Sequence, residues 1–127
     1  MDDFEQRDLE TSRGFKYRYY VSPPVTDTQD SKAPVLLLCH GFPDDAHMWQ
    51  FVVSHLMKSK LKIIVPDLLG YGGTSKPTDP ASYEIKGMVQ DVTEICKAEG
   101  VEESILPIGH DWLVHIQPEV EFAHQTY

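Results

Sequence analysis

The strongest constraint on the fold of this chain is a set of three short, mostly apolar runs. They are VLLLC (35–39), LKIIVPD (61–67) and SILPIG (104–109). Strands that are buried on both faces of a sheet have this composition, because neither of their faces meets water. The first two runs therefore predict buried strands of a covered sheet, and the third run predicts its last strand.

Two segments between these runs have the spacing of amphipathic helices. Residues 46–57 carry the first apolar face, made of Trp49, Val52, Val53 and Leu56. The second segment begins near Ser82, a candidate N-cap, and ends before Gly100, with an apolar face made of Ile85, Met88, Val89, Val92, Ile95 and Cys96. This alternation of strands and helices predicts an α/β fold with a mostly parallel sheet and crossover helices.

The N-terminal region gives a weaker signal. FKYRYYV (15–21) alternates in hydrophobicity and predicts a strand with one buried face. Residues 1–14 are polar and end in the turn signal Arg13-Gly14, and residues 22–34 form a polar, proline-bearing loop.

Composition excludes several classes of function. The net charge of −9 leaves no basic face for phosphate groups, so we do not expect nucleic-acid binding. The acidic N-terminus has no long apolar run, so we expect neither a signal peptide nor a membrane span, and we expect a cytoplasmic location. Cys39 and Cys96 lie in apolar surroundings without Cys or His neighbours that suit zinc. We expect buried thiols, no metal and no cofactor.

The segment ILPIGHDW (105–112) begins like a strand-to-helix elbow that exposes one side chain in a cleft. Gly109 meets the demand of such a turn for a small residue, and Asp111 takes its central position. A serine that attacked a saturated carbon would form a stable ether, whereas a carboxylate forms an ester that activated water can hydrolyse. Asp111 therefore indicates the opening of epoxides or the displacement of halide. The alternative is that Asp111 only caps a following helix.

The segment HGFPDD follows the first apolar run and would face the same cleft, because ligands bind beyond the carboxyl ends of parallel strands. His40-Gly41 turns the chain and Pro43 fixes the loop. The backbone N–H groups of Phe42 and Trp112 would then form an oxyanion hole for the tetrahedral intermediate of ester hydrolysis. A plain Gly/Pro turn is the alternative.

Together, LLLCHGFPDD, PDLLGYGGTSKP and ILPIGHDW resemble the epoxide hydrolase branch of the α/β-hydrolase family over roughly residues 10–112. The family's oxyanion loop matches His40, Gly41, Phe42 and Pro43, and its elbow matches Gly109, His110, Asp111 and Trp112. The resemblance implies that Asp111 is the nucleophile and that Phe42 and Trp112 are the N–H donors. It also implies a small apolar epoxide as substrate. Haloalkane and haloacid dehalogenases look similar and imply an organohalide instead.

The chain departs from the family pattern after the elbow. Leu113 stands where the family has glycine, and Pro118 interrupts the next stretch. We therefore expect a partial α/β-hydrolase domain over residues 1–112 and a divergent polar tail over residues 113–127. The family's lid, acid partner and general-base histidine have no counterpart here, which implies a truncated or variant form with impaired turnover. An alternative splice, a retained intron or a gene-model error would each produce such a tail.

Two non-catalytic alternatives stay open, a remnant without function and a partner of a longer relative. In the second case residues 104–109 would form an exposed edge strand that pairs with another chain. We expect His110 to be a buried core histidine, and we do not expect His115 to replace the missing base. Tyr71 is expected only to border the cleft.

Overall fold

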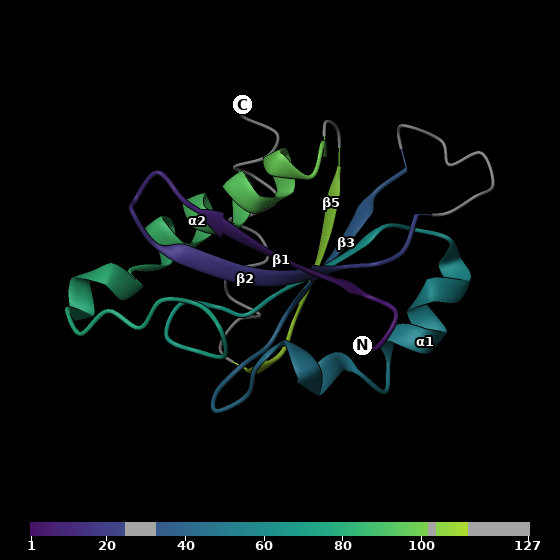
Figure 1. Cartoon of the computed structure of the whole chain (residues 1–127), viewed down its shortest axis with the longest axis horizontal. Helices are drawn as coiled ribbons and strands as arrows, with labels where there is room; N and C mark the ends of the chain where they lie inside the picture. Colours follow the sequence, from purple (N-terminus) through teal and green to yellow (C-terminus); the bar gives the residue numbers. More distant parts are fainter. Residues whose placement is uncertain (25–32, 102–103, 112–127) are drawn as a thin grey trace.

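The computed structural model describes residues 1–24, 33–101 and 104–111. Within them, a five-stranded sheet has the strand order β1-β2-β4-β3-β5. The strands are β1 (Glu5–Glu10), β2 (Lys16–Val21), β3 (Val35–Cys39), β4 (Ile63–Pro66) and β5 (Ile105–Gly109). The α-helices are α1 (Val53–Leu56) and α2 (Ile85–Ala98), and the 3-10 helices are η1 (Ala46–Trp49), η2 (Met57–Ser59) and η3 (Pro80–Tyr83). Figure 1 shows α1 and α2 on opposite sides of the sheet.

The sheet is mixed rather than mostly parallel. β3 runs parallel to both β4 and β5, as the three apolar runs predict. β1 pairs antiparallel with β2, and β2 pairs antiparallel with β4. The sequence analysis missed β1, because this strand lies at the end of the strand order and buries little. Only Arg7 and Leu9 of β1 are even partly buried, so its sequence stays polar.

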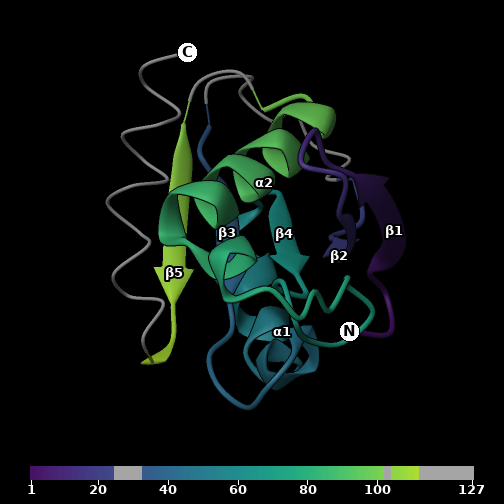
Figure 2. The same ribbon diagram turned by 90° about the vertical axis from the view of Figure 1, so that its left-hand side faces the viewer.

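β3 is buried along its whole length, as its unbroken apolar sequence predicts. Leu37 belongs to the core between the sheet and α2. Leu36 and Leu38 belong to the core on the other face, which includes Trp49 of η1 and Val53 of α1. Figure 2 shows α2 lying across the face of β3 and β4. The two faces of one strand therefore support both layers of helices.

The predicted helices are partly right. α2 buries most of its predicted apolar face, and Gly100 follows its end with a positive φ of 75°. Ser82 does not cap α2, because it lies inside η3, whose N-cap is Asp79. The single helix expected over residues 46–57 is wrong, since this segment is divided into η1, α1 and η2. Phe51 and Val52 at the break are exposed and belong to residue types with modest helix propensity.

A buried ion pair connects the hairpin of β1 and β2 to α2. Asp91 is fully buried and accepts hydrogen bonds from Arg13 Nη1 at 2.7 Å and from the Tyr17 hydroxyl at 2.9 Å. Burial raises the pKa of the Asp91 carboxyl, while the bonds from Tyr17 and Arg13 act in the opposite direction. Arg13 also donates to the Ser82 carbonyl at 2.6 Å, so one guanidinium connects the hairpin to the start of α2.

A second contact lies at the other end of α2. Glu99 accepts a hydrogen bond from the Tyr19 hydroxyl at 2.7 Å and forms an ion pair with Lys62 at 3.3 Å. Arg7 also binds the Glu99 carboxylate. Among the described residues, the Glu99 carboxylate therefore has three partners, Tyr19, Lys62 and Arg7, whereas the Asp91 carboxylate has the two hydrogen-bond donors Arg13 and Tyr17.

The two arginines give a test of this difference. Arg13→Gln removes the one charged partner seen for the buried Asp91, and we expect the free energy of unfolding to fall by about 3 kcal/mol. Arg7→Gln is the matched control and should cost about 1 kcal/mol or less, because Arg7 is more exposed and Glu99 keeps its other donors. Urea unfolding followed by circular dichroism measures both losses, and equal losses would contradict the assignment.

Candidate active site

The loops that follow β3, β4 and β5 lie together at the carboxyl ends of these strands. The strand register places Gly109 beside Cys39, so β3 and β5 end side by side. His40 Nε2 accepts a hydrogen bond from the Leu68 N–H at 2.9 Å, which connects the loop after β3 to the loop after β4. The prediction that these three loops meet at one edge of the sheet is confirmed for the described residues.

Asp111 has a backbone conformation that is uncommon for a residue with a side chain. Its φ is +62°, in the left-handed region, and the residue is exposed. An N-cap residue normally has extended backbone with negative φ, so simple helix capping does not fit this geometry. A strained turn after a strand is instead what an elbow requires.

The loop after β3 lies directly against this turn. A Cβ atom added at Gly41 would lie 2.5 Å from Asp111 Cβ and 2.8 Å from the His110 carbonyl oxygen. Contacts this short are not tolerated, so only glycine lets the two segments approach so closely. The close approach places the neighbouring residue, Phe42, next to the candidate elbow.

Phe42 has the features of a candidate N–H donor. Within the described residues its N–H makes no hydrogen bond, and its side chain is 67% exposed. The peptide bond between Phe42 and Pro43 is cis, and the Asp44 N–H closes the turn on the Gly41 carbonyl at 3.0 Å. Trp112, the second expected donor, lies outside the described residues.

His40 is a structural histidine rather than a base. It is fully buried, and its Nε2 accepts the Leu68 N–H, so the ring proton must lie on Nδ1. Nδ1 is 3.0 Å from the Gly41 carbonyl, to which it donates. Burial lowers the pKa of His40 and keeps the ring neutral. Both ring nitrogens are therefore occupied.

The Tyr71 ring lies edge-on against His40, with 5.0 Å between the ring centroids. Burial raises the pKa of the Tyr71 phenol, and the nearby Tyr83 and Asp111 raise it further. Tyr71 is thus within electrostatic reach of Asp111, which agrees with its expected position at the border of a cleft.

The prediction for His110 is wrong. His110 is exposed rather than part of the core. Its backbone N–H still continues the pairing of β3 with β5, since it donates to the Cys39 carbonyl at 3.1 Å. Only Ile105 of β5 is buried and Gly109 at its end is half-buried, so His110 lies beyond the packed part of the strand. The buried thiols expected at Cys39 and Cys96 are confirmed.

The sequence analysis missed Asp67, the carboxylate that directly follows β4 and is only 2% exposed. Its oxygens accept backbone N–H groups from both neighbouring loops. The available signal was the placement of an acidic residue between an apolar run and a glycine-rich loop.

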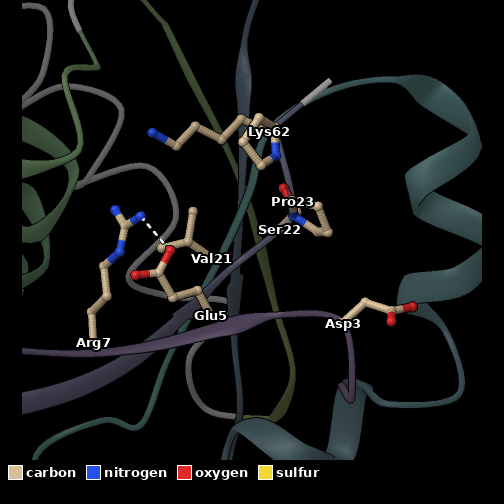
Figure 3. A pocket seen from close by; sticks show the side chains of 8 residues that line it. Asp3, Glu5, Arg7, Val21, Ser22, Pro23 and Lys62 are labelled. Carbon is tan, nitrogen blue, oxygen red and sulfur yellow. Dashed lines mark hydrogen bonds and ion pairs between the residues drawn. The ribbon is translucent and has the colours of Figure 1, made fainter. Parts of the chain in front are cut away.

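A pocket of about 400 Å³ lies elsewhere, near the start of β1 and of β4. Figure 3 shows Arg7 and Glu5 pointing toward one another in this pocket, where they form an ion pair at 2.7 Å. Lys62 on its wall is also paired with Glu99, so Glu5, Arg7 and Lys62 already have ionic partners. None of the described residues that line it belongs to the loops that follow β3, β4 and β5, so the pocket is not the candidate active site.

Among residues 1–24, 33–101 and 104–111, no group of three His, Cys, Asp or Glu side chains is placed to hold a metal ion. No helix in the same described ranges is both long and apolar enough to cross a membrane.

Residues 34–112 match the family described as alpha/beta hydrolase fold, and this match covers more than half of the chain. The chain belongs to this family. The predicted partial α/β-hydrolase fold and the resemblance to epoxide hydrolases are confirmed by this match and by the relatives below. The division at residues 112 and 113 stays a prediction, because residues 112–127 lie outside the described part.

Several relatives of this α/β-hydrolase are epoxide hydrolases. Epoxide hydrolase srdG of Neurospora crassa is 32% identical over 102 residues, which cover 80% of this chain and 30% of that protein. Fluoroacetate dehalogenase of a Burkholderia species is 42% identical over 81 residues, covering 61% of this chain and 26% of that protein. The structure of epoxide hydrolase A from Mycobacterium thermoresistibile is similar with a TM-score of 0.78 at 28% identity, covering 92% of this chain and 34% of that one. The chain spans about a quarter to a third of the length of these relatives.

The contact between Gly41 and the elbow gives a second test. Gly41→Ala forces the loop and the elbow apart, and we expect a loss of about 2 kcal/mol in the free energy of unfolding. The control is the same change in an Asp111→Gly background, which removes the nearest atom and should recover part of the loss. Urea unfolding of the four proteins measures the coupling, and fully additive losses would contradict the contact.

Proposed function

We propose that Asp111 is the nucleophile of an epoxide hydrolase-like reaction. The observation that carries this proposal is an exposed carboxylate on left-handed backbone, directly after a strand and against the Phe42 loop. The names of the relatives support the same chemistry, because several of them are epoxide hydrolases. A small apolar epoxide is the substrate class we propose.

In this reaction an oxygen of the Asp111 carboxylate attacks an epoxide carbon, and the bond from that carbon to the ring oxygen breaks. The ring oxygen takes up a proton and becomes a hydroxyl, while the enzyme carries an alkyl ester. Water would then attack the ester carbonyl and form a tetrahedral oxyanion. The N–H groups of Phe42 and Trp112 are the donors proposed for that oxyanion.

We propose that this ester turns over slowly. A base must activate the attacking water, and general-base catalysis is typically worth about 10²–10⁴-fold in rate. His40 cannot act as this base, because both of its ring nitrogens are engaged. His47 lies 3.4 Å from Asp45, and His55 is exposed on α1, so neither is an evident substitute. His110 is exposed and directly precedes Asp111, so its ring extends from the same turn as the nucleophile, and we do not propose it as the base.

A dehalogenase-like function is the second candidate, and the similarity to fluoroacetate dehalogenase favours it. The same carboxylate would displace halide from carbon and form the same kind of ester. The site geometry near Asp111 serves both reactions, so the distinction must come from the leaving group.

The non-catalytic alternative places β5 against a strand of another chain. The Ser104 carbonyl and the His110 N–H both bond to β3, so the intervening backbone groups of Ile105, Pro107 and Gly109 face the outer edge. Pro107 has no N–H to offer there, which weakens any added strand at its centre. We therefore rank this alternative below the catalytic one.

The first prediction of this proposal is an adduct on one residue. After incubation of the full chain with styrene oxide, peptide mass spectrometry should find the epoxide mass on Asp111. Asp111→Asn should abolish this adduct, because an amide is a far weaker nucleophile. Asp44→Asn, a change at an exposed carboxylate of the neighbouring loop, should leave it intact. An adduct distributed over other acidic residues and unchanged in Asp111→Asn would refute the assignment.

The second prediction concerns the fate of that adduct. If turnover is slow, the modified chain should persist after the excess epoxide is removed, and diol should form in no more than about one equivalent per chain. Fluoroacetate in place of the epoxide should release no fluoride. Release of fluoride without any epoxide adduct would instead favour the dehalogenase-like reaction, and rapid multiple turnover of the epoxide would disprove the slow step.

A further inference from the structure

We propose that Asp67 is a positioning residue that holds the Phe42 loop in place beside Asp111. This inference rests on the function proposed above, because positioning has a chemical consequence only if Asp111 reacts. Asp67 itself is buried and does not face substrate.

Both oxygens of the Asp67 carboxylate accept backbone hydrogen bonds from different loops. Oδ1 accepts the Ala46 N–H at 2.8 Å, at the end of the loop that carries Phe42. Oδ2 accepts the Gly73 N–H at 2.9 Å, in the loop that carries Tyr71. One side chain thus connects the loop after β3 to the loop after β4.

The other end of the Phe42 loop is fixed to the next residue along the chain. His40 Nε2 accepts the N–H of Leu68, which directly follows Asp67. The loop therefore has both of its ends, His40 and Ala46, bound to two consecutive residues at the end of β4. Between these ends, the turn that carries Phe42 has little freedom to move away from the elbow.

Asp67 is itself held firmly. Its backbone N–H donates to the Arg18 carbonyl at 2.8 Å, and its carbonyl accepts the Thr74 hydroxyl at 2.6 Å. A Cβ atom at Gly72 would lie only 2.2 Å from Oδ2, so the glycine loop wraps closely around the carboxylate. Asp67 is therefore bound to β2 as well as to both loops.

This arrangement requires a carboxylate rather than an amide. Each oxygen of Asp67 accepts an N–H, whereas an asparagine has one acceptor oxygen and one NH2 group. In Asp67→Asn one backbone N–H would face another donor and lose its partner. The change keeps the size of the side chain and breaks one of the two loop contacts.

The loss of this loop contact in Asp67→Asn should slow the chemical step, the attack of Asp111 on the epoxide. During attack, the Phe42 N–H can hold the non-attacking oxygen of Asp111 and so orient the attacking one. A displacement of about 1 Å can cost on the order of 10²-fold in rate. We expect Asp67→Asn to lower the maximum rate of adduct formation about tenfold, and to change the half-saturating epoxide concentration less than twofold.

Asp91→Asn is the matched control. Asp91 is also a buried carboxylate, but it binds Arg13 and Tyr17 in the contact between the hairpin and α2. Both variants should lose stability, and only Asp67→Asn should lose rate at a temperature where both are folded. Equal rates in the wild type and Asp67→Asn, or equal rate losses in the two variants, would overturn the positioning role.

Hydrogen exchange gives a readout that does not need the reaction. In Asp67→Asn the amide that faces the new NH2 group, either that of Ala46 or that of Gly73, should exchange at least tenfold faster, while the amides of α2 stay protected. If wild-type chain forms no adduct, the proposed function fails, and unchanged exchange separately overturns the role of Asp67.

Should Asp67→Asn not fold, Thr74→Val removes the hydroxyl that holds Asp67 and should cause a smaller rate loss, whereas a full rate would contradict the proposal.

Discussion

The burial of β3 on both faces is the constraint on which the rest of the structure depends. Leu37 packs under α2, and Leu36 and Leu38 pack under the segment that includes η1 and α1. A shift of the strand by one residue would exchange its two faces, so its register is fixed by packing on both sides. Because its register is fixed, the point at which β3 ends is also fixed, and the His40-Gly41 turn begins beside the end of β5.

Buried polar groups fix the arrangement of the loops, which the apolar core does not determine. At the carboxyl ends of the strands, His40 and Asp67 are both almost inaccessible to water, yet each has backbone partners for its polar atoms. Buried groups of this kind cost free energy unless they are paired, so pairing favours a single arrangement of the loops. At Asp91 only Oδ2 has hydrogen-bond partners, Arg13 and Tyr17, which connect the hairpin to α2, while Oδ1 is buried without a partner in the described part of the chain.

The sequence predicted the elements whose burial leaves a regular pattern. Continuous apolar runs identified β3, β4 and β5, and helical spacing identified α2. β1 was missed because a strand that buries little needs no apolar pattern, and the helix over residues 46–57 was predicted whole because spacing alone does not reveal a break. At the site, the chemistry of Asp111 could be argued from the sequence, because an aspartate takes the central position of the elbow motif. The positioning role of Asp67 could not be predicted from the sequence, since its partners Ala46 and Gly73 belong to two separate loops that meet only in the folded chain.

Two uncommon backbone features meet at Asp111, a left-handed conformation and the close approach of Gly41. Its left-handed backbone would suit glycine better, because an L-residue in that region typically costs about 1 kcal/mol or more. At the same point the Gly41 backbone lies so close to the elbow that a Cβ atom there would be only 2.5 Å from Asp111 Cβ. Lys60, the other non-glycine residue with positive φ in the described part, lies at an ordinary helix end, where that conformation closes the last turn. Asp111 instead directly follows a strand, and left-handed backbone at that point is what the nucleophile elbow proposed above requires.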